Sequence, residues 1–374
     1  MPESPPVADG GNPLLRGLRI LDLTRLLPGP FCTLYLAQLG ADVVKIEDPD
    51  GGDYTRTLAP ELFALVNRGK RSIALDLRKP DDAERFRALA ADADAVIESF
   101  RPGVMDRLGC GYETLRARNP RLVYAALTGY GHTGPWKDRA GHDLNYCGYA
   151  GVVDQNGPAG GPPVLSGFQI ADLAGGALTC AIGVLAALLG ARVSGQGCFV
   201  DCAMLDGTLA LQATTLATLR ALGKPLPRGG DMLTGGLPNY SVYECADGRY
   251  LALAALEPKF WRNFCLAVER PDWLRRPLAI GAAGEALRAE LTALFKSKPR
   301  DEWERLLAHR DCCVSAVLAP DEALATEQIR ARGLIEDDHG KPAVRSPLRF
   351  VGAQTATLAP APALGETALK ASGR

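Results

Sequence analysis

The chain has 374 residues, 47% of them hydrophobic, and a formal net charge of −1. This length suggests about two domains with real cores, and the near-neutral charge provides no global field to hold a nucleic acid or an anionic membrane. Apolar runs such as 181–189 are shorter than the ~20 residues that span a bilayer, and residues 1–12 are polar and Pro-rich rather than signal-like. We therefore expect a soluble cytoplasmic protein with neither nucleic acid nor membrane as a partner.

Ten cysteines are scattered over the chain, mostly within apolar segments. A chain of this size does not need disulfides to hold its fold together. Neither the pair Cys198 and Cys202 nor the pair Cys312 and Cys313 has a second Cys/His pair at the spacing of a zinc site. We expect reduced thiols that serve as small core residues, and no metal site.

Apolar runs alternate with helical patterns in the first part of the chain. Strands are predicted over 18–24, 41–47, 71–77, 95–100 and 122–128. Helices are predicted over 31–40, after a Pro-Gly-Pro turn at 28–30, and over 81–94 and 112–118. Strands separated by helices in this way indicate a parallel sheet that helices cover on both faces.

The composition changes in the second part of the chain. A Gly/Ala-rich helix is expected over 170–192, then an apolar run over 197–205 and a helix through Leu222, before a Gly/Pro-rich linker or loop at 224–239. Two alternating runs in 240–255 flank Asp247-Gly248, which predicts a hairpin with a type I′ turn. Helices are then predicted over 258–268, 283–297 and 300–309, and a strand over 312–318.

These patterns predict an α/β protein in three segments. Residues 1–224 are expected to form a large Rossmann-like domain with a parallel sheet, and 225–330 a smaller α+β domain. Residues 331–374 are polar and Pro-rich and lack a core of their own. We expect this last segment to pack back on the large domain or on a partner chain.

The segment 129–134 matches the pattern G-x-G-x-x-G and follows a predicted strand. A dinucleotide-binding fingerprint requires its third glycine to open a helix, whereas Pro135, Trp136 and a further glycine at 141 follow here. The sequence therefore favours a glycine-rich active-site loop over a nicotinamide site. Walker A, G-x-S-x-G and H-E-x-x-H patterns do not occur in the chain.

The chain has four histidines. His309 and His339 lie in polar surroundings and are expected at the surface, whereas His132 and His142 lie in the loop after a parallel strand, where open α/β sheets bind ligands. His142 is the better candidate for an imidazole base, because Asp143 adjoins it and an apolar segment follows. A purely structural histidine is the alternative.

Two carboxylates stand in apolar segments. Asp172 lies one turn into the Gly/Ala-rich helix, and Glu257 follows an apolar strand and precedes Pro258. Each is either an ordinary residue of a helix N-terminus or an acid with a function. Burial at the apolar helix start is expected to raise the proton affinity of Asp172.

At these residues the chain resembles the class III CoA-transferases, through ordered blocks that cover nearly its whole length. They include LRGLRILDLTRLLPGPFCTLYLAQLGADVVKIE, ESFRPGVMDRLGCGYE, LTGYGHTGPW, AGHDLNY, QIADLAGGAL and DGRYLALAALEPKFW. The resemblance implies two chains interlinked like rings, each with a large Rossmann-like domain and a small domain. It also implies active sites between the large domain of one chain and the small domain of the other.

Within this family the chain resembles the racemase branch, which interconverts 2R- and 2S-2-methylacyl-CoA thioesters. That branch carries Gly-His-Asp-Ile/Leu-Asn-Tyr and a glutamate in an E-P-x-F block, as at 141–146 and 257–260 here. The resemblance implies that His142 and Asp172 flank the carbon that loses and regains a proton. Glu257 is then expected to orient His142, and the backbone N–H of Asp143 to donate to the enolate oxygen. Coenzyme A enters as part of the substrate, and no prosthetic group is implied.

Two alternatives stay open. The transferase branch carries a Tyr-Asp pair at the position of His142 and relies on one aspartate, matched by Asp172, which would form an acyl anhydride and move CoA between carboxylic acids. A catalytically idle acyl-CoA-binding protein is the other alternative. The acyl group is not determined by the sequence.

The resemblance also suggests which residues contact CoA. In the segment SFRPGVMDRLG, Arg101 and Arg107 match a CoA-contacting loop that also contains Phe100 and Gly103. The expected set is completed by the basic pair Lys70 and Arg71 and by Leu26 and Leu27, which match positions on the adenine side. Where some members have an arginine after K-I-E, this chain has Asp48, which leaves one adenosine contact open.

Overall fold

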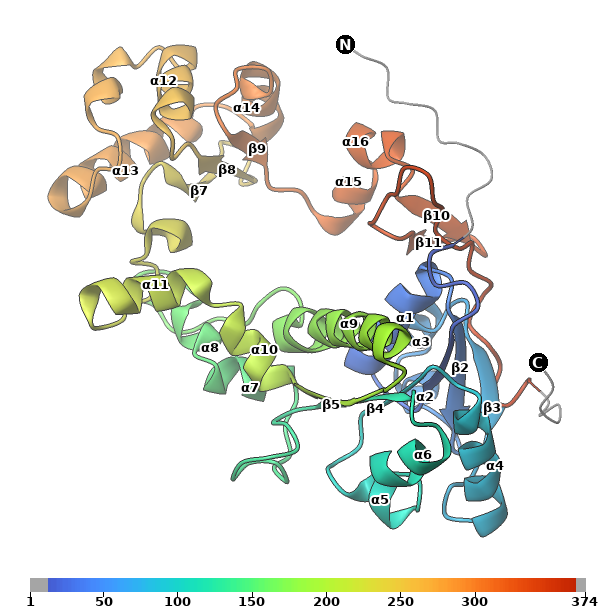
Figure 1. Ribbon diagram of the computed structural model, residues 1–374. Helices are drawn as coiled ribbons and strands as arrows, with labels where there is room; N and C mark the ends of the chain where they lie inside the picture. Colours follow the sequence, from blue (N-terminus) through green and yellow to red (C-terminus); the bar gives the residue numbers. More distant parts are fainter. Residues whose placement is uncertain (1–12, 368–374) are drawn as a thin grey trace. The chain divides into compact units, whose positions relative to one another are not determined.

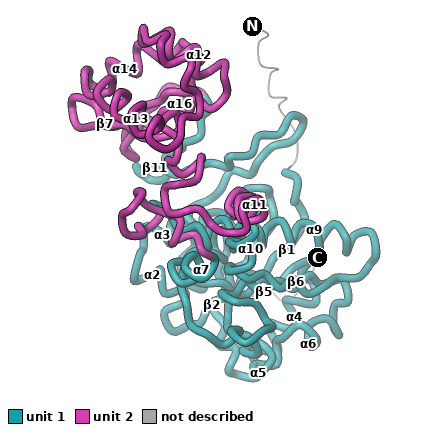
Figure 2. Tube along the Cα trace, turned by 90° about the vertical axis from the view of Figure 1, so that its left-hand side faces the viewer, with its two compact units in different colours: residues 1–150, 167–211, 332–374 teal, residues 151–166, 212–331 magenta. Residues whose placement is uncertain are grey.

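The computed structural model describes residues 13–367, which form two compact units (Figure 2). Unit 1 comprises the described parts of Met1–Ala150, Gly167–Leu211 and Arg332–Arg374, and unit 2 comprises Gly151–Ser166 and Gln212–Ala331. Compared with the predicted division, residues 151–166 and 212–224 therefore group with unit 2. The functional assignment of the predicted segments, CoA binding by 1–224 included, stays a prediction.

Unit 1 is built on a six-stranded parallel sheet with the strand order β3-β2-β1-β4-β5-β6 (Figure 1). Its strands are β1 (Arg19–Asp22), β2 (Asp42–Glu47), β3 (Arg71–Ala74), β4 (Ala95–Glu98), β5 (Val123–Thr128) and β6 (Phe199–Ala203). The predicted Rossmann-like parallel sheet is confirmed. Because the strand order reverses between β1 and β4, the loops that follow these two strands diverge and leave room for a ligand between them.

Helices cover both faces of this sheet. On one face α4 and α6 share an apolar core with the strands, through buried side chains such as Phe86, Leu115 and Val44. The other face carries α1 and α9 (Figure 1). The helices of unit 1 are α1 (Pro28–Gln38), α2 (Thr55–Leu58), α3 (Pro60–Val66), α4 (Pro80–Ala91), α5 (Val104–Arg107), α6 (Tyr112–Arg118), α7 (Asp143–Tyr149), the π-helix η1 (Ala171–Leu178), α9 (Thr179–Ser194) and α10 (Met204–Ala210).

The helix after β1 begins earlier than predicted. Pro28 occupies its first turn, so the predicted separate turn at 28–30 is wrong. Proline is tolerated there because the first N–H groups of a helix have no intrahelical acceptor, and its fixed φ suits the helix. The start of α1 is thereby brought directly against the loop after β1.

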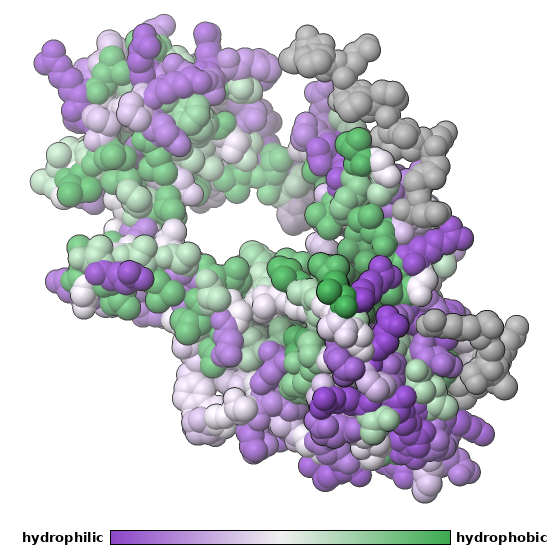
Figure 3. Space-filling view, viewed as in Figure 1, coloured by the Kyte–Doolittle hydropathy of each residue, from purple (hydrophilic) through white to green (hydrophobic). Residues whose placement is uncertain are grey.

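The helices η1 and α9 continue one another. Together they form one apolar helix, Ala171–Ser194, whose 24 residues are long enough to cross a membrane by length and composition, contrary to the expectation that no run reaches this length. Buried helices of soluble proteins share these properties, and Cys180 and Val184 on this helix are fully buried. Its other side is exposed and apolar at Leu189 and Val193, visible as green surface over α9 in Figure 3.

Unit 2 combines a small antiparallel sheet with helices. Its elements are α8 (Val152–Gln155), α11 (Ala213–Leu222), the irregular segment η2 (Met232–Gly236), β7 (Tyr240–Glu244), β8 (Tyr250–Ala254), α12 (Pro258–Ala267), the 3₁₀ turn η3 (Pro271–Arg275), α13 (Gly281–Phe295), α14 (Arg300–Leu307), β9 (Val314–Ala316), α15 (Pro320–Leu324) and α16 (Glu327–Ala331). The sheet has the order β7-β8-β9. Its core is aromatic, with Trp261, Phe264, Trp273, Phe295 and Trp303 buried in one cluster. The predicted α+β architecture is present.

The predicted turn type of the β7–β8 hairpin is wrong. A type I′ turn requires positive φ at both central residues, but only Gly248 has it, at 75°, while Asp247 does not. The N–H of Gly248 donates to the carbonyl of Cys245, and the N–H of Cys245 to the carbonyl of Arg249. The connection is thus a longer loop that closes on a left-handed glycine.

The C-terminal segment hydrogen-bonds to unit 1. The N–H of Ala356 donates to Gln38, that of Thr367 to the carbonyl of Ser72, and that of Gly69 to Ala359. Within this segment β10 (Ile335–Asp338) and β11 (Lys341–Val344) form an antiparallel hairpin that the sequence analysis did not predict. A polar tail without a core of its own is therefore held by backbone pairing.

Candidate active site

A cavity of about 870 Å³ opens in unit 1 at the carboxyl ends of the parallel strands. Loops after β1, β4 and β5 and the π-helix η1 supply its walls. Among its lining residues are Arg25, Leu26, Leu27, Tyr54, Ser99, Phe100, Arg101, Tyr130, His142, Asn145, Tyr146 and Asp172. This is the place where open α/β sheets bind ligands, and the volume suits a sizeable organic molecule.

His142 is held at the start of α7 by a reciprocal pair of hydrogen bonds. Its backbone N–H donates to Asn145 Oδ1 at 3.0 Å, and the N–H of Asn145 donates to the carbonyl of His142 at 2.8 Å. These bonds fix the backbone and leave the exposed imidazole at the cavity wall. A residue placed in this way is available to a ligand.

Asp172 is the second residue of the π-helix η1 and lines the same cavity. Burial, with a contribution from the charge of Asp143, raises the pKa of its carboxyl group from 3.8 to about 7. The increase expected from the apolar helix start is confirmed. At neutral pH the acid and the carboxylate are therefore both populated, so this group accepts or donates a proton readily.

The carboxylate of Asp143 connects the two predicted bases. Its Oδ1 accepts the backbone N–H groups of Ala171 at 2.7 Å and of Asp172 at 3.0 Å, which caps the start of η1. Because Asp143 follows His142 directly, α7 and η1 are linked at the residues that carry His142 and Asp172. The side chain was missed in the sequence analysis, which considered only the N–H of Asp143; that donor role stays a prediction.

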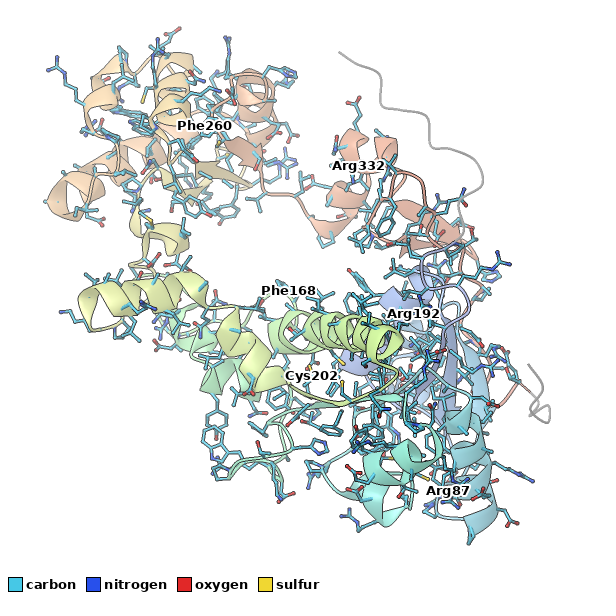
Figure 4. All side chains as sticks on the ribbon, in the orientation of Figure 1. Arg87, Phe168, Arg192, Cys202, Phe260 and Arg332 are labelled. Atoms are coloured by element: carbon cyan, nitrogen blue, oxygen red, sulfur yellow. The ribbon has the colours of Figure 1, made fainter. Side chains whose placement is uncertain are left out.

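Close contacts between glycines set the position of η1. A Cβ atom on Gly207 of α10 would lie 1.9 Å from the carbonyl oxygen of Gly175, and one on Gly175 would lie 2.3 Å from Thr208 Oγ1. Only glycine allows this approach. The helix α10, which contains Gly207, follows β6 directly; Figure 4 labels Cys202 on this strand.

The loop 129–142 is shaped by Tyr146. The Tyr146 hydroxyl donates to the carbonyl of Gly141 at 2.6 Å, and its ring lies 5.1 Å from that of Tyr130 in an edge arrangement. A Cβ on Gly129 or Gly141 would come within 2.5 or 2.7 Å of the Tyr146 ring. No helix begins between 129 and Asp143, so the predicted glycine-rich loop is confirmed against the dinucleotide fingerprint. Burial raises the pKa of Tyr146 to about 12.

Four of the residues expected to contact CoA line the cavity, namely Leu26, Leu27, Phe100 and Arg101. Gly103 and Arg107 are not among the lining residues. Gly103 adopts φ of 79° at the start of α5, which carries Arg107. Their contact with CoA stays a prediction.

Lys70, also expected to contact CoA, does not line the cavity. Its side chain is fully buried, and Nζ lies 3.1 Å from Asp22 Oδ2, 3.0 Å from the carbonyl of Pro30 and 2.8 Å from Asn67 Oδ1. Enclosed by these partners, the Lys70 side chain has no surface exposed to the cavity.

Arg71 is also turned away from the cavity. Its guanidinium pairs with the carboxylate of Asp42, with the shortest distance 2.6 Å, where β2 begins. That end of the sheet is opposite to the carboxyl ends that face the cavity. Neither residue of the basic pair lines the cavity, and their contact with CoA stays a prediction.

Two residues at or behind the cavity wall were missed in the sequence analysis. Arg25 lines the cavity, and the buried Glu98 at the end of β4 accepts the N–H of Phe100 at 2.6 Å. Burial raises the pKa of Glu98 to about 8. The position of Glu98 within the apolar run AVIESF was the only sequence signal for this glutamate.

Glu257 lies in unit 2, whereas His142 and Asp172 lie in unit 1. It is the exposed residue that precedes the first turn of α12, the helix that carries the labelled Phe260 in Figure 4. Its charge contributes to the raised pKa of the Cys313 thiol, after burial. Its expected role toward His142 stays a prediction.

Asp48, where the sequence departs from the family, lies at a second, smaller cavity of about 220 Å³. Its carboxylate pairs with Arg78, whose Nη2 is 3.2 Å from Asp48 Oδ2. Arg25 and Phe100 line both this cavity and the larger one. A cation is thus present here in the form of Arg78.

Known proteins match this chain over most of its length. The family model for CoA-transferase family III matches residues 15–368. The human alpha-methylacyl-CoA racemase is 36% identical over 320 residues, covering 85% of this chain and 81% of that protein, and the succinyl-CoA:mesaconate CoA-transferase of Haloarcula hispanica is 40% identical over 273 residues, covering 69% and 68%. A crystal structure of a CAIB/BAIF family protein from Brucella suis matches with a TM-score of 0.84 and 33% identity, covering 96% of this chain and 97% of that one.

Proposed function

The chain belongs to CoA-transferase family III, and we propose that it is an acyl-CoA racemase, which interconverts 2R- and 2S-2-methylacyl-CoA thioesters. One observation carries this proposal: the imidazole of His142 and the carboxyl group of Asp172 line the same cavity. A racemase needs one group on each face of the reacting carbon. A transferase that works through one aspartate has no use for the histidine.

In the proposed reaction, one group removes the proton next to the thioester carbonyl and the other returns a proton to the opposite face. With a pKa of about 7, Asp172 serves as the base in one direction and as the acid in the other. The enolate oxygen formed between the two steps requires a donor. The N–H of Asp143 opens helix α7, where N–H groups lack intrahelical acceptors and the helix dipole favours negative charge. Both steps are proton transfers, so the proposal involves no metal, flavin or nicotinamide.

CoA transfer between carboxylic acids is the second candidate, because relatives named as transferases match as well as those named as racemases. In that reaction the Asp172 carboxylate attacks the thioester carbonyl, CoA leaves as the thiolate, and an acyl anhydride remains on the enzyme. Asp172 would thus form a covalent bond to the acyl group rather than transfer a proton. Only an experiment on the substrate's α-carbon separates the two.

Incubation with a single enantiomer of a 2-methylacyl-CoA in D₂O makes this separation. We expect deuterium to enter the 2-position, and the other enantiomer to appear, without any added carboxylic acid. If no deuterium enters the 2-position and CoA instead moves to an added carboxylic acid, the racemase proposal is rejected in favour of the transferase.

Single substitutions assign a face to each base. His142→Ala and Asp172→Asn should each lower interconversion by about a hundredfold or more, while each retains wash-out of the α-proton from one enantiomer, with opposite preferences. His309→Ala, at an exposed histidine in unit 2, serves as the matched control. Near-normal interconversion in His142→Ala, with all turnover lost in Asp172→Asn, would make the histidine structural.

We extend the proposal to an interlinked homodimer in which Glu257 of one subunit orients His142 of the other. The exposed apolar side chains of α9, Ile182, Leu189 and Val193, support a surface that a second copy covers. Co-expression of His142→Ala with Glu257→Gln should restore activity, because a mixed dimer then contains one intact composite site. Two inactive variants that do not complement each other would place all three residues in one subunit. The ten unpaired cysteines suit a reducing compartment such as the cytoplasm.

A further inference from the structure

Arg25 lies between two neighbouring cavities of unit 1. It lines both the cavity of about 870 Å³ and the cavity of about 220 Å³, as does Phe100. The centre of its guanidinium is 5.2 Å from the ring centroid of Tyr54 and 5.1 Å from that of Phe100. Nη1 also donates to the Tyr54 hydroxyl at 3.1 Å. Two aromatic rings therefore hold the cation between the cavities.

The backbone at Arg25 is held as firmly as the side chain. The N–H of Arg25 donates to Ser99 Oγ at 3.2 Å, and the N–H of Leu26 donates to Asp53 Oδ1 at 3.0 Å. Leu26 has φ of 66°, a left-handed conformation that a residue with a Cβ rarely adopts. Such strain persists only where the surroundings impose it, and it occurs preferentially at functional sites.

Carboxylates near Arg25 are already paired with other cations. Asp53 pairs with Lys45 at 3.0 Å, and Asp48 pairs with Arg78. Over residues 13–367, no salt bridge includes Arg25. An arginine has five N–H donors, so most of those on Arg25 are available to an anion that enters the junction.

We propose that Arg25 binds the diphosphate of a ligand that extends through both cavities. The inference rests on the proposed function, since an acyl-CoA has its diphosphate between the nucleoside and the pantetheine arm. With the thioester near His142 and Asp172 in the larger cavity, the opposite end of the ligand points toward the smaller one. A planar guanidinium at the junction then meets phosphate oxygens with two parallel N–H donors.

Truncation of the substrate tests this assignment. Arg25→Gln should raise KM for an acyl-CoA by about tenfold or more and leave kcat nearly unchanged, because the contact is far from the reacting carbon. KM for the acyl-pantetheine thioester, which lacks the diphosphate, should not change. Arg116→Gln is the matched control, because Arg116 also stacks on a tyrosine, Tyr112, but lines neither cavity.

Equal increases of KM for both thioesters would overturn the inference and make Arg25 a support for its loop. Arg25→Lys gives a second measurement: it keeps the charge, so it should bind acyl-CoA more tightly than Arg25→Gln does. Equal affinities of these two variants would also reject a phosphate contact.

Calorimetric titration with CoA itself separates this inference from the proposed function. If the wild-type protein binds CoA more tightly than Arg25→Gln does but exchanges no deuterium, the inference on Arg25 holds and the racemase proposal is rejected. Wild-type protein that binds no CoA, or binds it as weakly as the variant, rejects the inference.

Discussion

Two aspartates of unit 1, Asp22 and Asp172, are both withdrawn from water but have opposite surroundings. Asp22 ends β1, and Lys70 Nζ lies 3.1 Å from its Oδ2, while the hydroxyls of Thr24 and Thr33 donate to it at 2.5 and 2.6 Å. Asp172 lines the cavity and has the carboxylate of Asp143 as its charged neighbour. One carboxylate is neutralised by partners, and the other is not.

The pKa values follow this difference. Burial alone would raise both, but Lys70, Lys45 and the two hydroxyls hold the pKa of Asp22 well below its usual range. Burial and Asp143 together raise the pKa of Asp172 to about 7. The comparison shows how one fold keeps one carboxylate charged and leaves another able to exchange a proton near neutral pH.

The largest expected effect comes from removing Lys70, the cation that pairs with the buried carboxylate of Asp22. Lys70→Met leaves the Asp22 carboxylate fully buried with one cation fewer, so the free energy of unfolding should fall by about 3–5 kcal/mol. Urea unfolding monitored by circular dichroism measures this change.

The double variant Lys70→Met/Asp22→Leu removes both charges. Because a buried ion pair contributes little net stability relative to apolar side chains, the double variant should recover much of the loss. A loss below about 1 kcal/mol in Lys70→Met alone would show that Asp22 does not depend on this cation.

Much of the fold could be predicted because the buried strands are continuous apolar runs separated by helical patterns. The types of the turns were harder to predict from the sequence. The sequence analysis assigned a type I′ turn to Asp247-Gly248, whereas the residues with positive φ at both positions are His339, at 55°, and Gly340, at 82°. The hairpin of β10 and β11 turns there, in a polar segment without the apolar alternation that identifies a hairpin.

In the site, the residues that touch the cavity were largely predictable and those that support them were not. His142 and Asp172 stand out as polar residues in apolar or glycine-rich segments. The burial of Lys70 could not be predicted, because a basic residue in a loop gives no sign of burial, which here depends on Asp22, 48 positions away. The capping contact of Asp143 with η1 likewise depends on two helices that meet only in the folded chain.

A smaller effect is expected from replacing Asp172, whose carboxyl group has no cationic partner among the causes of its raised pKa, by a neutral residue. Since folding raises the pKa of Asp172, its contribution to stability is full below about pH 4 and is lost as the pH rises through about 7. Asp172→Asn has no such titration. Relative to wild type, the variant should gain about 2 kcal/mol in the free energy of unfolding between about pH 5 and about pH 8.5.

Urea unfolding of both proteins at the two pH values checks this gain. Asp81→Asn, at an exposed position in the first turn of α4, is the control. A difference between wild type and Asp172→Asn that does not change with pH would mean that the carboxyl group titrates normally in the folded protein.

The smallest expected effect separates the charge of Asp143 from its hydrogen bonds. Asn at this position keeps an oxygen that accepts the N–H groups of Ala171 and Asp172 but removes the like charge, so the pKa of Asp172 should fall while its burial persists. If Asp172 acts as proposed, the acidic limb of the pH profile for α-proton exchange should therefore shift to lower pH, by less than about one unit. Asp143→Ala loses the cap as well and should also lower kcat, because η1 is no longer held at its first turn. An Asp143→Asn profile that coincides with that of wild type would assign the raised pKa of Asp172 to burial alone, and the contrast with Asp22 would then lie in the missing cation rather than in the added anion.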